Sequence, residues 1–415
     1  MRRLWTVVSG NSDLRLLLGA NLISLIGDWI LRTGIAYQIY VLTGSTLASA
    51  AAVLASLVPQ LLLGSVAGVY VDRWDRRRTM AVTNLLMAAA LLPLLVVQDT
   101  GQAWVVYLVI AVQSCLAPFF ASAEAALVPS VVPEDQLVTV NSLNAQIRDV
   151  ARLIGAALGG VIVASGGIAL LSIVDGVTFL LAAALILRIR ARLAPRSGER
   201  PHVLREWADG LRIATGSTTL RVFLAFTLIT GIGEAILGTL LAPFVRDVLG
   251  GDARAFGIIM SAQAVGGIGA GLFVTTVGHR FPPRLMFGWG AATFGLLDLV
   301  LFLYPLATDA LWPAVVIIAV VGVPCAFMVA GAMTAFQLAT GDDHRGRVWG
   351  ATVAVDGLAM LIGTIAAGAL AERLGILPVI VVQGVAYTAA GVLVLRKLPR
   401  APETIGECLV TSSPR

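Results

Sequence analysis

Charged side chains inside long apolar segments are the residues of this chain that could bind a proton or a charged ligand. Asp28 lies near the middle of an apolar segment over 14–42, and Arg32 follows four residues later. That spacing puts both side chains on one face of a helix. Glu234 lies at the same depth of another apolar segment, over 220–245. At the centre of a bilayer a charge costs at least ~2.5–3.5 kcal/mol, so each side chain there requires a partner or a function.

Two interpretations of these three residues are open. Asp28 and Arg32 either form a static ion pair, which would keep the carboxyl ionised, or they belong to a site that exchanges protons. Glu234 has no charged residue within one turn of its own helix, so we expect it to take up a proton more readily. The sequence thus predicts Asp28, Glu234 and Arg32 as proton-coupling residues.

A second group of charges, Arg148, Asp149 and Arg152, lies in the segment over 138–165. These residues either face a substrate cavity, where the arginines would neutralise a carboxylate or hold an anion, or they form a structural cluster at the cytoplasmic helix end. Other acidic residues in apolar segments are weaker candidates: Glu124 and Asp356 as second-rank sites, Asp175 and Asp298 as interfacial or packing residues.

The composition predicts an all-α polytopic membrane protein. Hydrophobic residues make up 58% of the 415 positions, charged residues 13%, and the mean hydropathy is +0.90. Soluble proteins carry roughly a quarter charged residues, and a β-barrel would show short alternating strands instead of long apolar runs. The three cysteines lack paired or metal-ligand spacing, so we expect free thiols, no metal and no cofactor. No basic patch is interleaved with aromatics, so nucleic acid is not an expected partner.

Twelve apolar segments, each about long enough to cross a bilayer, divide the chain into two bundles. We predict an N-terminal six-helix bundle over 1–187, a cytoplasmic linker over 188–219, a C-terminal six-helix bundle over 220–396 and a cytoplasmic tail over 397–415. In the linker, apolar residues at helical spacing indicate either a short amphipathic helix at the membrane surface or a disordered linker with one such turn: Leu204, Trp207, Leu211 and Ala214.

The two bundles are copies of one unit. The sequence around Asp28 repeats around Glu234 at an offset of 206 residues, and Pro118 repeats as Pro324 at the same offset. Gly155 repeats as Gly363 at an offset of 208. Arginines concentrate in the even-numbered loops, so the positive-inside rule predicts that both termini are cytoplasmic. The arginine-, alanine- and valine-rich composition favours a bacterial source, and we expect the chain in the inner membrane.

A charged turn between the second and third segments carries the most specific motif, Gly68-Val-Tyr-Val-Asp72-Arg73-Trp74-Asp75-Arg76-Arg77. It resembles the signature of major facilitator transporters. Further motifs resemble one subgroup, that of macrolide-efflux, enterobactin-export and Tap-like multidrug pumps: Ser24-Leu-Ile-Gly27-Asp28-Trp29, Val132-Pro133-Glu134-Asp135, Asn141-Ser142-Leu143-Asn144 and Arg345-Gly346-Arg347-Val348.

The resemblance implies twelve transmembrane helices in two six-helix bundles that alternate in access. It also implies that the charged turn latches the cytoplasmic side through Gly68, Asp72, Arg73, Arg76 and Arg77; a solvated turn is the alternative, and an exposed ion pair contributes only ~0–1 kcal/mol. Small residues at four-residue spacing let helices approach closely, so we predict helix packing at Gly155, Gly159, Gly160 and Gly363.

The expected function is secondary active transport. The chain has neither a nucleotide-binding loop nor a nucleophile with its base, so neither a primary pump nor an enzyme is expected. The resemblance implies a proton-coupled antiporter, acting as a monomer, that exports amphipathic small molecules. Export of one endogenous metabolite is the alternative, and a regulatory facilitator without transport is less favoured. Cavity candidates, each of which could instead face lipid or pack, are Trp29, Tyr37, Phe119, Phe120, Phe244 and Phe327.

Overall fold

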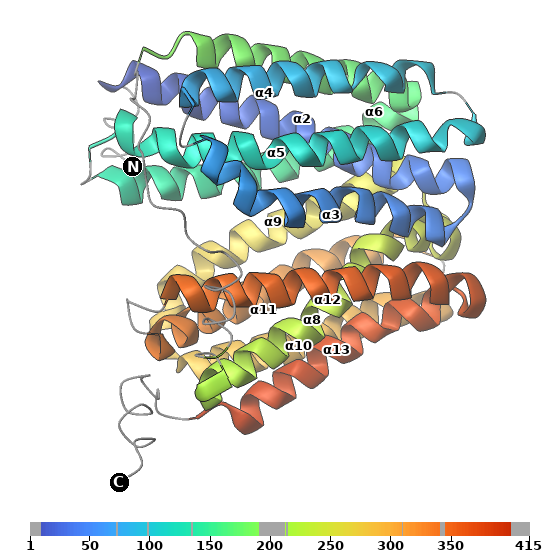
Figure 1. The fold of residues 1–415 in the computed structure, drawn as a ribbon. Coiled ribbons are helices and arrows are strands. Elements are labelled where there is room, and N and C mark those ends of the chain that lie inside the picture. Colours follow the sequence, from blue (N-terminus) through green and yellow to red (C-terminus); the bar gives the residue numbers. More distant parts are fainter. Residues whose placement is uncertain are drawn as a thin grey trace. The chain divides into compact units, whose positions relative to one another are not determined.

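The computed structural model describes residues 10–71, 74–97, 99–133, 136–190, 212, 215–308, 310–340 and 345–399. Every regular element in these ranges is helical, which confirms the predicted fold class (Figure 1). The α-helices are α2 (Ser12–Thr43), α3 (Thr46–Val71), α4 (Arg76–Ala90), α5 (Ala103–Val131), α6 (Leu137–Leu187), α8 (Thr218–Pro243), α9 (Ala253–Val277), α10 (Pro283–Leu303), α11 (Trp312–Ala339), α12 (Arg345–Leu374) and α13 (Ile376–Lys397).

Eleven α-helical elements lie in the described ranges, against the predicted twelve segments. The predicted fifth and sixth segments are two helices that meet at a kink within α6, where Gly167 has φ 62° and ψ −155°. Glycine adopts this positive φ without the steric cost that a side chain would add, so the chain turns there without a loop. Ten spans among the described residues are long and apolar enough to cross a membrane.

Several helix ends follow from local sequence. Gly44 ends α2 in the left-handed region, at φ 63°, and its N–H donates to the carbonyl of Tyr40. Pro93 cannot donate a backbone hydrogen bond, and after α4 the chain continues as a 3-10 helix over Leu92–Val96. Two further short helices extend α8 and α10, over Phe244–Val248 and Tyr304–Leu306.

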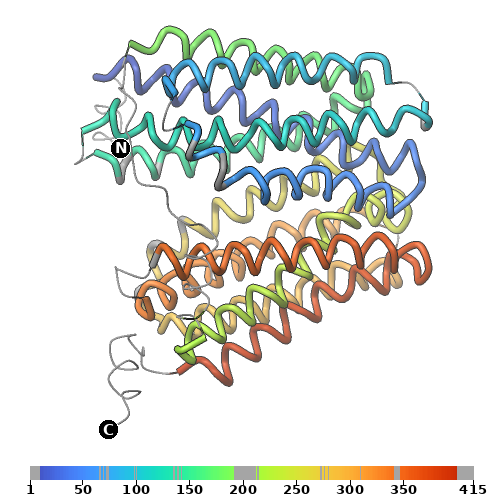
Figure 2. The backbone as a smooth tube through the Cα atoms, viewed as in Figure 1, coloured from blue at the N-terminus to red at the C-terminus, as the bar shows by residue number. Residues whose placement is uncertain are grey.

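The chain folds as two compact units. The first comprises Met1–Gly44, Ala51–Arg200 and Gly251–Ser261, and the second comprises Ser45–Ala50, Pro201–Gly250 and Ala262–Arg415. Within each unit the helices lie side by side (Figure 2). The predicted amphipathic helix of the linker, Leu204 to Ala214, and most of the predicted tail, from residue 400 onward, lie outside the described residues.

Both units use the same glycine contact between helices. A Cβ on Gly155 of α6 would lie 2.7 Å from the carbonyl oxygen of Ile26 and 2.5 Å from Cβ of Trp29, both on α2. A Cβ on Gly363 of α12 would lie 2.6 Å from the carbonyl oxygen of Ile232 and 2.8 Å from Cβ of Ala235, both on α8. The contacted positions are related by the same 206-residue offset as Asp28 and Glu234. The duplication seen in the sequence is therefore also a duplication of helix packing.

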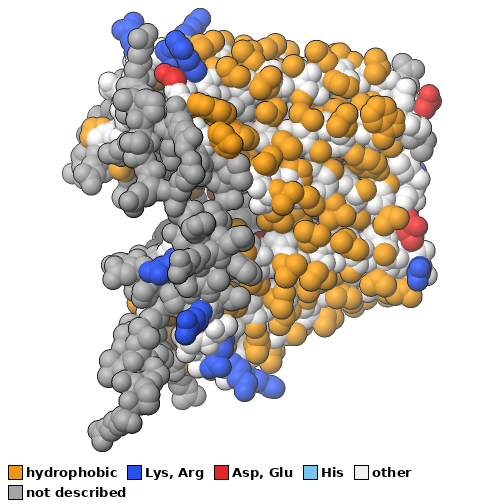
Figure 3. Space-filling model, viewed as in Figure 1, with side chains coloured by type: hydrophobic (Ala, Val, Ile, Leu, Met, Phe, Trp, Pro, Cys, Tyr) orange, Lys and Arg blue, Asp and Glu red, His pale blue; other side chains and the backbone are white. Residues whose placement is uncertain are grey.

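The surfaces of both units suit a lipid environment. Hydrophobic side chains cover the flanks of the helices in each unit, while lysine and arginine gather at helix ends (Figure 3). Trp104 and Trp312, which are 208 residues apart in the sequence, lie at the starts of α5 and α11 and are 63% and 69% exposed. Tryptophan at helix ends is typical of the boundary between hydrocarbon and headgroups.

Replacement of Gly155 by alanine is expected to lower stability, because the new methyl group would overlap α2. Overpacking of this kind costs about 1–3 kcal/mol. Gly176→Ala, on the second arm of α6, is the matched control, since a Cβ there would meet nothing within 4 Å. There alanine is expected to be neutral or stabilising by up to ~1 kcal/mol. Thermal unfolding in detergent measures both, and equal melting temperatures for the two variants would contradict the packing role.

Candidate functional site

Helix α2 is enclosed on two of its faces by the two arms of α6. Against the second arm, over 168–187, Gly27 leaves room for the side chains of Asp175 and Thr178, and Gly34 leaves room for Leu171. Against the first arm, over 137–166, the backbone of α2 at Ile30 packs on Gly159 in addition to the Gly155 contact. The side chains on the remaining face of α2 point into the interior of the first unit.

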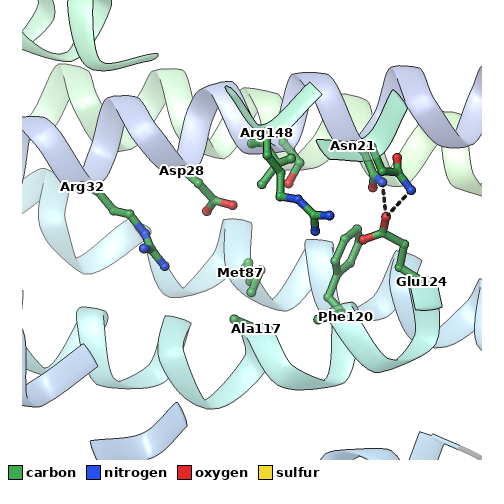
Figure 4. A pocket seen from close by; sticks show the side chains of 12 residues that line it. Asn21, Asp28, Arg32, Met87, Ala117, Phe120, Glu124 and Arg148 are labelled. Carbon is green, nitrogen blue, oxygen red and sulfur yellow. Dashed lines mark hydrogen bonds between the residues drawn. The ribbon is translucent and has the colours of Figure 1, made fainter. Parts of the chain in front are cut away.

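This remaining face lines a cavity of about 210 Å³ in the first unit (Figure 4). Helix α5 contributes residues at positions i, i+3, i+4 and i+7, which share one side of a helix. The full lining is Asn21, Ser24, Leu25, Asp28 and Arg32 of α2, Met87 of α4, Ala117, Phe120, Ala121 and Glu124 of α5, and Asn144 and Arg148 of α6. Charged, amide and apolar side chains thus meet at one site.

Glu124 is held by two amides at one end of the cavity. Nδ2 of Asn21 donates to Oε1 of Glu124, and Nδ2 of Asn144 donates to the same oxygen at 3.4 Å. Arg148 is close enough to interact with this carboxyl electrostatically. From the sequence Glu124 is a weaker candidate than Asp28, although the four-residue spacing of Phe120 and Glu124 on α5 puts both on one face.

Asp28 and Arg32 line the same cavity without forming a static ion pair. No ion pair closer than 4.0 Å joins Asp28 to Arg32, although both residues are described. Arg32 is exposed while Asp28 is half-buried. Their charges still interact across the cavity, and Figure 4 shows the Asp28 carboxyl turned toward Arg148, with Arg32 on the other side of Asp28.

Asp175 is buried beside Asp28, which agrees with the packing alternative predicted for it and not with the interfacial one. Its side chain is 0% exposed and packs on Gly27. Oγ1 of Thr178 donates to Oδ1 at 3.1 Å, whereas Oδ2 has no hydrogen-bond partner among the described residues. Asp28 and Arg32 are the charged groups that act on it. A second carboxyl therefore lies behind the cavity wall.

The second unit contains a comparable acidic cluster around Glu234. The hydroxyl of Tyr387 donates to Oε2 of Glu234 at 3.0 Å. Asp298, which is 3% exposed, accepts a hydrogen bond from Nε2 of Gln383 at 3.0 Å and interacts electrostatically with Glu234. Asp298 is thus a packed residue rather than an interfacial one. Glu234 thus has a tyrosine partner on α13, which could not be predicted from the residues near Glu234 on its own helix.

Most of the other predicted cavity residues lie elsewhere in their units. Asp149 is exposed, and the Arg152 guanidinium lies over the Trp29 ring, 5.6 Å from its centroid. The aromatic candidates pack on other rings: Tyr37 on Phe256, Phe119 on Trp74, and Phe244, which is fully buried, on Phe302. Arg148 and Phe120 are the predicted cavity residues that line this cavity together with Asp28 and Arg32.

A second cavity, of about 440 Å³, lies between α10 and α11 in the second unit. Phe327 lines it and packs edge-on against Phe273 and Phe281. Its lining is almost wholly apolar, with Thr293 as the polar exception. Phe327 therefore has no part in the charged cavity of the first unit.

The charged turn is only partly described, because Asp72 and Arg73 lie outside the described residues. Asp75 caps α4 by accepting the N–H of Arg78 at 2.8 Å. Arg76 donates to the carbonyl of Ala126 at 2.9 Å and Arg77 to that of Ile189 at 2.6 Å. Both arginines thus tie the start of α4 to neighbouring chain within the first unit. Gly68 has open space around its Cβ position, and Gly160 packs on the carbonyl of Ala253.

Comparison with known proteins identifies the family. The family model described as "Transmembrane secretion effector" matches residues 10–407. Macrolide efflux protein A of Streptococcus pyogenes is 24% identical over 362 residues, which cover 85% of this chain and 88% of that protein. The multidrug efflux pump Tap of Mycobacterium tuberculosis is 28% identical over 408 residues, covering 94% and 95% of the two chains.

Solved structures agree on the fold. A bacterial homologue of the iron transporter ferroportin, in an inward-facing state, superposes with a TM-score of 0.75 at 18% identity, covering 92% of this chain and 98% of that one. A D-xylose-proton symporter superposes with a TM-score of 0.70 at 14% identity, covering 94% and 99%. Together with the family match, these likenesses show that the chain belongs to the major facilitator superfamily, as a multi-pass membrane transporter of small molecules and not an enzyme.

Proposed function

We propose that this transporter is a proton-coupled antiporter that exports amphipathic small molecules by alternating access. The observation that carries the proposal is the cavity of the first unit, where charged and apolar side chains line one space among helices long enough to cross a membrane. Its proposed partners are the substrate, protons and the lipid bilayer. The proposed setting is a bacterial inner membrane, with a monomer whose termini are both cytoplasmic.

The cavity lining supports an amphipathic substrate. Leu25, Met87 and Phe120 offer apolar contact area, whereas Asp28 and Arg148 offer charge. Sites with mostly apolar walls and a few fixed polar groups are typical of small-molecule binding. Efflux appears in the names of two relatives that match most of the chain, which supports the outward direction of transport.

Paired acids in both units support proton coupling. Asp28 interacts electrostatically with Asp175, and Glu234 with Asp298. Two carboxylates in one low-dielectric site repel each other, and protonation of one relieves that repulsion. A proton that crosses a membrane potential of 100 mV releases about 2.3 kcal/mol, which is the proposed source of energy.

Asp72 with Arg76 is the proposed cytoplasmic latch.

Export of a single endogenous metabolite is the alternative reading of the same cavity. A compound-susceptibility panel in an efflux-deleted host, repeated with a protonophore, decides between the two. Broad resistance that the protonophore removes supports drug efflux driven by protons. Resistance to no compound, together with secretion of one cellular metabolite, supports the alternative.

Glu234→Gln is expected to abolish proton-driven uphill export and to leave substrate binding in place. The amide mimics the protonated acid permanently, while it can still accept the hydrogen bond from Tyr387. The measurement is substrate-induced proton movement in liposomes. Asp99→Asn, at an exposed carboxyl, is the matched control and is expected to behave as the parent protein. Proton-coupled export that survives in Glu234→Gln would move the coupling role to Asp28 or another acid.

The cysteine in the variant Ala121→Cys is expected to react with a small hydrophilic thiol reagent, because Ala121 is exposed and lines the cavity. Ala123→Cys is the matched control on the same helix, since Ala123 is 0% exposed. Both are made in a background in which Cys115, Cys325 and Cys408 are replaced by alanine. Mass spectrometry measures labelling with and without a transported compound. Equal labelling at both positions, or no protection by the compound, would argue against this substrate route.

A further inference from the structure

We infer that Glu124 is the point at which the cavity of the first unit recognises a protonated amine on an amphipathic substrate. The inference rests on the proposed function, because it names the class of substrate that the cavity takes. It is carried by the hydrogen bonds through which Asn21 of α2 and Asn144 of α6 hold the carboxyl of Glu124 of α5 at the cavity wall.

One oxygen of Glu124 is fixed before any ligand arrives. Oε1 accepts hydrogen bonds from Asn21 and Asn144, whose side chains are 3% and 8% exposed. Donors aimed at a carboxylate favour its charged form and oppose the cost of burying that charge. Since the two asparagines come from different helices and are themselves buried, the carboxyl group is held in one orientation. Such preorganisation reduces the entropy lost on binding.

The other oxygen is available to a ligand. Glu124 is half-buried and lines the cavity, and Oε2 accepts no hydrogen bond from the part of the chain that the structure describes. In Figure 4 both dashed lines end on one oxygen, and the second oxygen points toward Phe120. A carboxylate oxygen accepts more than one hydrogen bond, so Oε2 can receive the N–H groups of an ammonium ion.

Neither arginine of the cavity occupies that oxygen. Arg148 interacts with Glu124 electrostatically, yet no ion pair closer than 4.0 Å joins them among the described residues. Figure 4 shows the Arg148 guanidinium between Asp28 and Glu124, with Arg32 beyond Asp28. Charges of opposite sign thus alternate along the cavity and end on the carboxylate of Glu124. An ammonium group at this end meets a carboxyl group that no arginine of the cavity contacts directly.

The surroundings of Glu124 fit the rest of such a ligand. Phe120 lies one turn earlier on the same face of α5, where its ring can face a bound cation and add a cation–π attraction. Leu25, Met87 and Ala117 provide apolar wall for a hydrocarbon or aromatic body. An anionic ligand would use Arg148 instead and would face repulsion from Glu124, so the sign of the ligand charge separates the two possibilities.

The test compares three fluorescent probes that share one dansyl body. Dansylcadaverine ends in a primary amine, its N-acetyl derivative is neutral, and dansylaminohexanoic acid ends in a carboxylate. Binding to the purified full-length transporter in detergent is followed by dansyl fluorescence. We expect the parent protein to bind the amine about ten- to hundredfold more tightly than the neutral probe, because a charge-assisted hydrogen bond contributes that much affinity. We expect the acid to bind most weakly.

Glu124→Gln is expected to lose this preference, so that amine and neutral probe bind within about twofold of each other. Retained affinity for the neutral probe shows that the variant is folded. Glu124→Asp keeps the charge and is expected to retain a reduced preference for the amine; it serves if the glutamine variant does not fold. Asp99→Asn is the control carboxyl-to-amide change on the exposed surface and is expected to match the parent.

Four outcomes would overturn the inference. They are an unchanged preference in Glu124→Gln, equal affinity of the parent for all three probes, tighter binding of the acid, and no binding of any probe by the parent. The assay uses no proton gradient, so its result is independent of coupling. Loss of proton-coupled export in liposomes with an intact amine preference in detergent would contradict the proposed function alone.

Discussion

The close approach of α2 to both arms of α6 is the constraint on which the first unit depends. At Gly155 and Gly159 the backbones come near enough that a methyl group would overlap α2, and at Gly27 the gap is filled by Asp175 from the second arm. Because lipid provides no hydrophobic drive between helices, such contacts rely on small residues. With two faces of α2 occupied, the third presents Asp28 to a cavity. The position of the charged group is thus a consequence of helix packing.

Much of this architecture could be predicted from the sequence, because its causes are local or repeated. Long apolar runs give the helices, and helix ends such as Gly44 follow from residues that tolerate a positive φ. The matching segments around Asp28 and Glu234 indicate duplication, and the equivalent contacts of Gly155 and Gly363 follow from it. The predicted segment over 138–165 ends close to the kink at Gly167, but the sequence could not show that helical structure resumes directly after it.

The side-chain partners could not be predicted, because they depend on the rotation of one helix against another. Hydropathy gives the depth of Glu124 but not that asparagines from α2 and α6 point at it. It gives no sign that Tyr387 of α13 reaches Glu234. Phe244 illustrates the opposite error, since an aromatic ring in a membrane helix fits a cavity and a packed interior equally well, and here it is buried on Phe302.

The repeat separates what the two units share from what each does. Backbone packing is duplicated, but the residues that line the charged cavity are not. Five of the polar or charged lining residues of the first unit are different in the second copy: Asn21 corresponds to Thr227, Arg32 to Gly238, Glu124 to Ala330, Asn144 to Thr352 and Arg148 to Asp356. The acid on the first helix is kept in both, as Asp28 and Glu234. Asp175, however, is replaced by Gln383, and the neighbouring acid comes instead from Asp298 on α10. In both units a buried acid therefore lies beside the carboxyl of Asp28 or Glu234, although different residues supply it. The asparagine-bound carboxylate of Glu124 and the arginines of the cavity belong to the first unit. This pattern is what a transporter requires if both halves respond to protons but one half holds most of the polar contacts with the substrate.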